Sequence, residues 1–388
     1  MPIKNRFAET HAEIAGWRRH LHQYPELQFD VHETAKFVEE KLRSFGITDI
    51  TTGIGRTGVV AVIEGKTNTS GRTIGLRADM DALPIHEATG LEYASKTAGK
   101  MHACGHDGHT AMLLGAAQYL AETRNFDGRC VLIFQPAEEG GGGGNEMVKD
   151  GLMDRWKIQE VYGMHNMPDY PVGEFAIRPG ALLAATDQFD LIIEGRGGHA
   201  AAPHEAIDAN LAAAHVLVAL QSIASRNVDP IKQVVVSVCT LRSDTDSYNV
   251  LPQQVTLRGT VRTLAEDVRD LAEERLRAVV THTAVAYQCT AEIDYERGYP
   301  VTVNHDEHTA YAADAAEKVT PGVWRDTPPI MAGEDFSYML NARPGAYMMI
   351  GNGYGPTVHH PMYNFNDDAI PAGCSWYAEM VETRLPAA

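Results

Sequence analysis

The stretch Met101–Thr110 holds three histidines, one cysteine and one aspartate. Cysteine and histidine are common transition-metal ligands, and both bind metals in deprotonated form. Gly105 and Gly108 allow the backbone to turn, so that neighbouring side chains can point at one centre. The apolar run Ala111–Ala117 follows and indicates that a loop enters a buried helix here. The pattern predicts a metal site; the alternative is a histidine-rich surface loop that binds nothing.

Two adjacent carboxylates, Glu138 and Glu139, follow the predicted strand Arg129–Phe134. Near a metal such a pair can divide two tasks, because one residue binds the ion and the other accepts a proton from water. The glycine run Gly140–Gly144 comes next and lacks the Gly-Lys-Ser/Thr ending of a phosphate-binding loop. We therefore expect no nucleotide there, and expect a close backbone approach or a moving loop instead.

Further polar residues lie at other predicted strand ends. Asp79 and Asp81 follow the strand Thr73–Arg77, and His165 ends the strand tip at 161–166. Ligands gather at the carboxyl ends of strands in open α/β sheets. The alternative for the two aspartates is a polar turn. The potential metal ligands, taken from four separate segments, are Cys104, His106, Glu139, His165 and His359. A single catalytic zinc usually takes three protein ligands, so this larger set predicts two metal ions.

The elements that must position these residues follow from apolar periodicity. Helices are predicted over residues 8–23, from Asp30 to Gly46, from the histidine stretch to Ala121, over 307–319 and over 370–385, and further strands over 58–63 and 345–351. Asp30 and Glu33 have the spacing of a capping box. Arg18 and His22 are interpreted as cations that favour the carboxyl end of the first helix.

The composition changes between residues 186 and 296, where the pattern reads β-α-β-β-α-β. The predicted strands are 188–194, 233–241, 254–262 and 289–295, and the predicted helices are 207–225 and 265–287. The ligand-rich pattern resumes only after this segment. We therefore predict an inserted α+β domain at 186–296, within an α/β domain formed by 1–185 and 297–388.

Charge and cysteine usage exclude several classes of protein. The formal net charge of −18 argues against nucleic-acid and anionic-membrane partners, and no apolar run is long enough to span a membrane. The amino terminus lacks the apolar core of a secretory signal. Five widely spaced cysteines are no disulfide framework and are expected in a reducing cytoplasm, with all except Cys104 predicted as core thiols.

Taken together, these segments resemble the M20 metallopeptidases, and within them the aminoacylase, hippurate hydrolase and indole-acetyl-amino-acid hydrolase subgroup. The matching stretches are Leu76–Pro84, Met101–His109, Gln135–Gly140, Gly163–Asn166, Gly197–Pro203, Gly333–Phe336 and His359–Pro361. The resemblance implies a split metal-bearing α/β domain, with a mixed sheet and helices on both faces, and a ferredoxin-like lid that forms a homodimer or a dimer-based oligomer. It also implies a metal-dependent amidohydrolase that acts on N-acyl-L-amino acids.

The resemblance also assigns roles to individual residues. Cys104 stands where related peptidases have a bridging aspartate, and Glu138 matches the general base. Arg77 stands where other branches have a ligand histidine, so Asp79 is expected to support the centre rather than to bind metal. His199 matches a histidine that reaches the active site of the partner subunit. Asn249 and Arg262 match family residues that face the substrate.

Several alternatives stay open at this point. A surface ion pair is the alternative for Arg262. The chain could be a dipeptidase or carboxypeptidase of the same family, or a non-catalytic protein that binds metal or peptide. Mixed thiolate, imidazole and carboxylate ligands admit Zn, Mn, Co or Ni.

Overall fold

The computed structural model describes residues 4–387, which form two compact units. The first unit contains the chain up to Leu182, Val303–Pro328 and the chain from Asp335 onward. The second contains Leu183–Thr302 and Pro329–Glu334. The return of Pro329–Glu334 to the second unit is a feature that the sequence pattern did not predict.

The first unit is built on an eight-stranded mixed sheet with the order β1-β2-β4-β3-β5-β16-β6-β15. Its strands are β1 (Ile50–Ile54), β2 (Gly58–Glu64), β3 (Thr73–Asp79), β4 (Arg129–Gln135), β5 (Glu160–Met167), β6 (Phe175–Ala176), β15 (Val323–Trp324) and β16 (Gly345–Gly351). Its helices are α1 (Asn5–Gln23), α2 (His32–Ser44), α3 (His106–Thr123), α4 (Gly143–Lys149), α5 (Leu152–Arg155), α8 (Asp306–Val319), α9 (Phe336–Ala342) and α10 (Ile370–Arg384). The chain passes between the units at β7 (Gly180–Leu183) and β14 (Thr302–Asn304).

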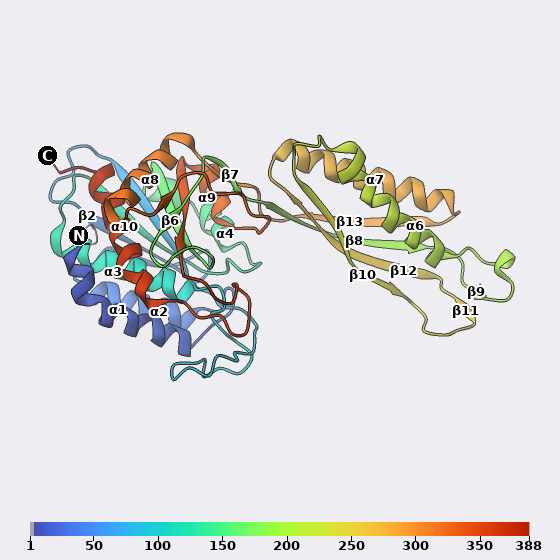
Figure 1. Cartoon of the computed structure of the whole chain (residues 1–388), viewed down its shortest axis with the longest axis horizontal. Helices are drawn as coiled ribbons and strands as arrows, with labels where there is room; N and C mark the ends of the chain where they lie inside the picture. Colours follow the sequence, from blue (N-terminus) through green and yellow to red (C-terminus); the bar gives the residue numbers. More distant parts are fainter. Residues whose placement is uncertain (1–3, 388) are drawn as a thin grey trace. The chain divides into compact units, whose positions relative to one another are not determined.

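Four adjacent strands of this sheet, β4, β3, β5 and β16, run parallel. Strand β3 is buried along its whole length, as expected for a parallel strand covered on both faces. Helices α3 and α10 pack together over β3, and α1 packs on α3 (Figure 1). The side chain of Arg77 lies 5.7 Å from the Phe336 ring of α9, so α9 covers the opposite face. The predicted α/β class with helices on both faces is confirmed.

The capping box predicted at Asp30 and Glu33 is wrong. Helix α2 begins after Val31, and no side chain of that residue caps it. The carboxylate of Glu26, from the preceding loop, accepts instead from the Glu33 backbone N–H at 3.2 Å and from the Thr34 N–H at 2.8 Å. A residue several positions upstream can replace a local cap because the loop folds back across the helix end.

The two cations at the end of α1 were also misinterpreted. Arg18 is completely buried, and its Nε donates to Asp367 at 2.7 Å. His22 is buried as well and bonds through Nδ1 to Asp107 at 2.8 Å. Their partners are therefore carboxylates from distant segments rather than the carboxyl end of the helix.

The second unit is an antiparallel sheet in the order β10-β12-β8-β13, carrying two helices. Its elements are β8 (Ala185–Glu194), α6 (Ala209–Ser222), β10 (Val234–Ser243), β12 (Gln254–Thr263), α7 (Glu266–Ala286) and β13 (Thr290–Arg297), with a ribbon of β9 (Gly198–His199) and β11 (Val250–Leu251) (Figure 1). This is the strand order of a ferredoxin-like fold, as predicted. A 3-10 turn (Pro203–Glu205) and a π-helical turn (Ile223–Asn227) complete it.

The cysteines are all free in the described chain, but their burial differs from one to another. Cys130, Cys289 and Cys374 are buried, as expected for core thiols. Cys239 is exposed, so its prediction as a core thiol is wrong. It lies on β10, an edge strand, and an apolar sequence there need not be covered. Among residues 4–387, no helix combines the length and apolar character that crossing a membrane requires.

The observed cap makes a prediction about stability. Glu26→Ala should lower the free energy of unfolding by about 1 kcal/mol, because two N–H groups of α2 lose their acceptor. Asp30→Ala is the matched control and should change it by less than about 0.5 kcal/mol. Urea unfolding followed by fluorescence measures both variants. Equal losses in the two would contradict the assignment of the cap.

Candidate metal centre

The carboxyl ends of the four parallel strands bring the predicted ligands into one region. Strand β4 leads into the loop with Glu138 and Glu139, β3 leads to Asp81, and β5 carries His165. The loop that follows β16 carries His359, whose backbone N–H donates to Ala103 O at 2.7 Å. Neighbouring parallel strands end at the same edge of a sheet, which explains why segments distant in sequence meet here.

Two groups of possible ligand atoms share the thiol of Cys104. Within each group all atoms lie within 4.8 Å of one another. One group is Cys104, His106 and His165, and the other is Cys104, Glu139 and His359. Glu138 forms a further group with His106 and Glu139, and its Oε2 lies 4.0 Å from His106 Nε2. The structure thus brings together all five predicted metal ligands and the predicted base.

The buried His106 and the half-buried His165 both present Nε2 to this cluster. His106 Nδ1 bonds to Asp81 O at 2.8 Å, and His165 Nδ1 bonds to Asn166 O at 2.5 Å. A carbonyl can only accept, so Nδ1 carries a proton in both rings and Nε2 is the nitrogen that can bind a metal once it is deprotonated. His106 Nε2 is buried without a hydrogen-bond partner, and His165 Nε2 lies 3.3 Å from Cys104 Sγ. A second hydrogen bond that fixes the tautomer in this way is usual for metal-binding histidines.

The loop with the two glutamates is fixed by Asp81. Its carboxylate accepts from the Glu138 N–H at 2.9 Å and from the Glu139 N–H at 3.1 Å. Ala137 has a φ of 54°, a left-handed conformation that costs energy for a residue with a side chain. Successive N–H groups can then converge on one carboxylate. Asp81 thus holds the backbone of both glutamates and, through its carbonyl, His106.

The glycine run closes the same loop. A Cβ atom on Gly143 would lie 1.7 Å from Pro136 O, so only glycine fits there. The Gly144 N–H donates to the buried Asp335 at 2.8 Å, and Asp335 also accepts from Gln135 Nε2 at 2.7 Å. Of the two expectations for these glycines, a close backbone approach is the one that the structure confirms.

The electrostatics of the cluster favour bound cations. Burial alone would lower the pKa of His106, but Asp79, Asp81 and Glu139 raise it to about 10. Burial raises the pKa of Cys104 well above its usual value, and Glu139 and Glu138 raise it further. The surrounding carboxylates therefore stabilise positive charge and disfavour a lone thiolate. Divalent cations bound to the sulfur would balance that charge, so these ligands fit a metal centre.

Asp79 and His109 form a fourth group with His106, but both are fully engaged. His109 Nδ1 donates to Asp79 Oδ1 at 2.6 Å, and His109 Nε2 accepts from the Asn166 N–H at 2.8 Å. Asp79 Oδ2 accepts from Arg77 Nη1 at 2.7 Å. Burial would raise the pKa of Asp79, but His106, Arg77 and His109 lower it well below its usual value. Asp79 therefore supports the ligand loop as a buried anion.

Asn166 and Tyr363 position the Cys104 loop, and sequence reasoning missed both. Asn166 Nδ2 donates to Cys104 O at 2.5 Å, and Tyr363 Oη donates to Asn166 Oδ1 at 2.5 Å. Gly105 has a φ of 86°, and a Cβ there would lie 2.2 Å from Asn166 Nδ2. The position of Asn166 directly after His165 was the one available signal, whereas Tyr363 has no ligand-like neighbour in sequence.

The remaining predicted site residues, His199, Asn249 and Arg262, belong to the second unit. His199 is exposed on β9 and pairs with Val250 of β11, and the neighbouring Ala200 N–H donates to Asn249 O. Arg262 lies near the carboxyl end of β12, where it pairs with Thr186 of β8. Among residues 4–387 the Arg262 guanidinium makes no ion pair, which argues against the surface-pair alternative.

The Asn166 contacts predict a loss of metal affinity. Asn166→Ala should weaken metal binding by about 10–100-fold, as is usual for residues that orient a ligand. Asn304→Ala is the matched control, because Asn304 makes three hydrogen bonds away from the cluster, two of them buried. Metal titration monitored by calorimetry compares them. Equal affinities in the two variants would show that Asn166 does not position Cys104.

Comparison with known proteins gives a consistent result. The profile of the peptidase family M20/M25/M40 matches residues 75–383. The chain is 43% identical over 359 residues to the N-acetyl-L-cysteine deacetylase of Bacillus subtilis, covering 92% of this chain and 85% of the relative. It is 41% identical over 374 residues to the hippurate hydrolase of Campylobacter jejuni, covering 96% of each.

A solved structure from Bacillus subtilis, described as a dinuclear metal binding peptidase from the M20 family, is 33% identical. It superposes with a TM-score of 0.85 over 98% of this chain and 100% of that chain. The resemblance inferred from the motifs is therefore confirmed. With Cys104 shared between two groups of ligands at the carboxyl edge of its main sheet, this chain belongs to the hydrolases of peptidase family M20/M25/M40.

Proposed function

We propose that this protein hydrolyses the amide bond of N-acyl-L-amino acids with the help of two divalent metal ions. The observation that carries the proposal is the pair of ligand groups that share Cys104, with Glu138 beside them. The names of the relatives, a deacetylase of N-acetyl-L-cysteine and a hippurate hydrolase, support the substrate class.

One ion would take Cys104, His106 and His165, and the other Cys104, Glu139 and His359. Divalent ions supply Lewis acidity, which lowers the pKa of water and polarises a carbonyl oxygen. Thiolate, imidazole and carboxylate ligands suit Zn, Mn, Co or Ni. Binding requires loss of the Cys104 proton, so metal affinity should rise with pH.

Glu138 moves the proton in this proposal. Its backbone is held by Asp81, and its Oε2 lies 4.0 Å from His106 Nε2, at the edge of the ligand groups. The carboxylate accepts a proton from the attacking water and passes it to the departing amine, which leaves as a free amino acid. Glu139 has its Oε1 at 3.2 Å from His359 Nε2. In this proposal Glu139 binds metal and does not accept the proton.

The second unit supplies the substrate contacts. Arg262 would bind the substrate carboxylate through its guanidinium fork, and Asn249 would orient the amide. His199 would donate a hydrogen bond to the oxygen that gains charge. However, the His199 ribbon adjoins the start of β12, whereas Arg262 lies eight residues along it, roughly 26 Å away at the usual rise of a strand. One small substrate cannot span that distance, so we assign His199, together with Asn249 on the same ribbon, to the active site of a partner subunit.

An uncharged sheet edge supports this dimer. Strand β10 is an edge strand and has no charged residue from Val234 to Leu241. Val235 and Leu241 are 37% and 43% exposed, and Val218 of the neighbouring α6 is 67% exposed. Monomeric proteins usually protect such edges with charge. We propose that two copies pair through β10 and α6.

The five free cysteines support a reducing compartment, and we propose the cytoplasm.

The assignment of the two glutamates is directly testable. Glu138→Gln should keep both metal ions and lower kcat by about 10²–10⁴-fold, because the proton acceptor is lost. Glu139→Gln should lose metal. Glu146→Gln, on the following helix, is the matched control and should change neither. The measurements are elemental analysis of metal content and release of amino acid from hippurate and N-acetyl-L-cysteine.

Other results would favour the alternatives. Release of amino acids from dipeptides but not from acyl amino acids would indicate a peptidase. Full activity of Glu138→Gln would identify a different base. A metal-loaded wild-type protein that hydrolyses none of these substrates would leave only a binding function.

The proposed dimer has its own test. Val235→Lys combined with Leu241→Lys should dissociate the dimer and lower activity, because charges repel across the paired edges. Val285→Lys, a change at a valine on α7 that is 63% exposed, should leave both unchanged. Sedimentation velocity gives the oligomeric state. A monomeric wild type, or a double variant that stays dimeric, would contradict the interface.

A further inference from the structure

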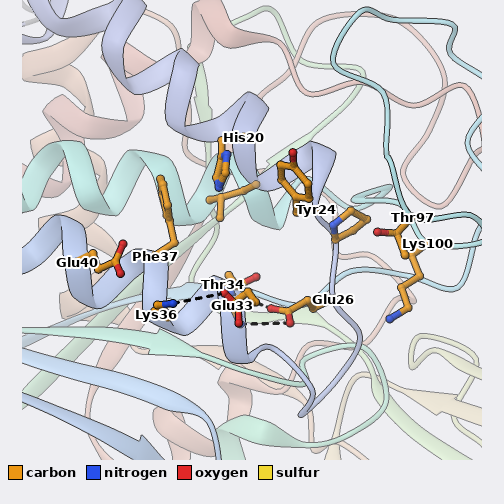
Figure 2. A pocket seen from close by; sticks show the side chains of 12 residues that line it. His20, Tyr24, Glu26, Glu33, Thr34, Lys36, Phe37, Glu40, Thr97 and Lys100 are labelled. Atoms are coloured by element: carbon orange, nitrogen blue, oxygen red, sulfur yellow. Dashed lines mark hydrogen bonds and ion pairs between the residues drawn. The ribbon is translucent and has the colours of Figure 1, made fainter.

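A cavity lies in the first unit, away from the proposed metal ligands and substrate contacts. It has a volume of about 460 Å³, within the usual range for small-molecule sites. Figure 2 shows its walls, formed by the end of α1, the first half of α2 and the segment that holds Thr97 and Lys100. None of the five proposed metal ligands lines it.

One wall of this cavity is aromatic. The His20 ring stacks on Phe37 with a centroid distance of 4.8 Å and an interplanar angle of 25°. Tyr24 continues the wall, with its ring 5.1 Å from that of His20. The buried residues Leu21 and Pro25 lie beside them. Such a surface accepts a planar apolar group by stacking.

Lysines surround this wall although the chain as a whole is acidic. Lys36 and Lys100 line the cavity, Lys41 Nζ lies 5.5 Å from the Phe37 ring centre, and Lys96 Nζ lies 4.9 Å from that of Tyr24. Burial lowers the pKa of His20, and Lys41 and Lys96 lower it further. Two lysines therefore line the cavity and two more lie against its aromatic rings, beside three lining glutamates.

The acidic residues of the cavity compensate these lysines only in part. Glu26 is engaged by two N–H groups of α2, and Glu33 pairs with Lys36 at 3.9 Å. Glu40 lies at the opposite end of the view from Lys100 in Figure 2. Within the described chain Lys100 makes no ion pair, so its ammonium group is available to an anion.

We propose that this cavity binds an organic carboxylate with a planar apolar body, the body packed against His20 and Tyr24 and the carboxylate beside Lys100. A cationic ligand fits less well, because the rings of Phe37 and Tyr24 already have lysines over them. The identity of the ligand rests on the proposed function, since the acid released from an aromatic N-acyl amino acid belongs to this class.

The cavity wall is joined to the metal-ligand loop. Glu26 O accepts from the Ala82 N–H at 2.8 Å, and Leu27 forms a parallel bridge with Ala82. Ala82 follows Asp81, which holds Glu138 and Glu139. A ligand that restrains residues 24–27 should therefore slow amide exchange at Ala82.

The direct test is photolabelling of the metal-loaded protein with 4-benzoylbenzoate, with the labelled peptides mapped by mass spectrometry. Labels are expected within residues 20–37 or 97–100. Benzoate should compete for this site, and benzamide, which lacks the charge, should not. Lys100→Gln should reduce labelling by about three- to fivefold, the usual effect of one exposed charge pair. Lys66→Gln, a lysine outside the cavity, is the control.

Phe37→Ala tests the stacking wall, and its thermal unfolding and exchange at Ala82 show whether the fold is kept. Labels confined to other peptides, equal competition by benzamide, or full labelling of Lys100→Gln would each overturn the proposal. Labelling does not require turnover, so the two proposals fail separately. Labelling without hydrolysis of N-acyl amino acids would overturn only the proposed function, and hydrolysis without labelling would overturn only this site.

Discussion

The structure depends on a concentration of acidic groups that are removed from water at one edge of a sheet. Cys104, Glu138 and Glu139 meet there, and Asp79 and Asp81 lie directly behind them. Arg77 and the His109 ring satisfy Asp79, and backbone N–H groups satisfy Asp81. Glu139 lies 3.2 Å from His359, and Glu138 lies 4.0 Å from His106, and both histidines belong to the ligand groups that share the thiol. Because buried charge is costly unless it is paired, bound cations would stabilise this arrangement.

The parallel strands place these acidic groups and the metal ligands in a defined arrangement. Each of β3, β4, β5 and β16 ends at the same edge, and each leads into a segment with a ligand or a residue that holds one. The supporting hydrogen bonds come from backbone groups: Asp81 O fixes His106, Asn166 O fixes His165, and Ala103 O fixes the His359 segment. Side chains held in this way are oriented before any metal binds, which lowers the cost of binding.

Much of this could be predicted from the sequence because the main signals are local. Cysteine and histidine spacing marked Cys104 and His106, and polar residues after apolar strands marked Glu138 and His165. The parts that failed depend on tertiary contacts. Arg18 and His22 could not be recognised as buried, because Asp367 and Asp107 reach them from distant segments. Cys239 is exposed because β10 is at the edge of its sheet. The apolar pattern of a single strand does not predict that strand's place in the sheet. Tyr363 is identified only through its contact with Asn166.

The most direct test of the account is X-ray absorption spectroscopy on protein loaded with cobalt or zinc. The account predicts two ions per chain, sulfur in the first coordination shell of each, and a metal–metal distance of about 3.5–4 Å. In Cys104→Ala the sulfur contribution should disappear. One ion per chain, or two ions without sulfur ligands, would contradict the shared role of Cys104 on which the proposed chemistry rests.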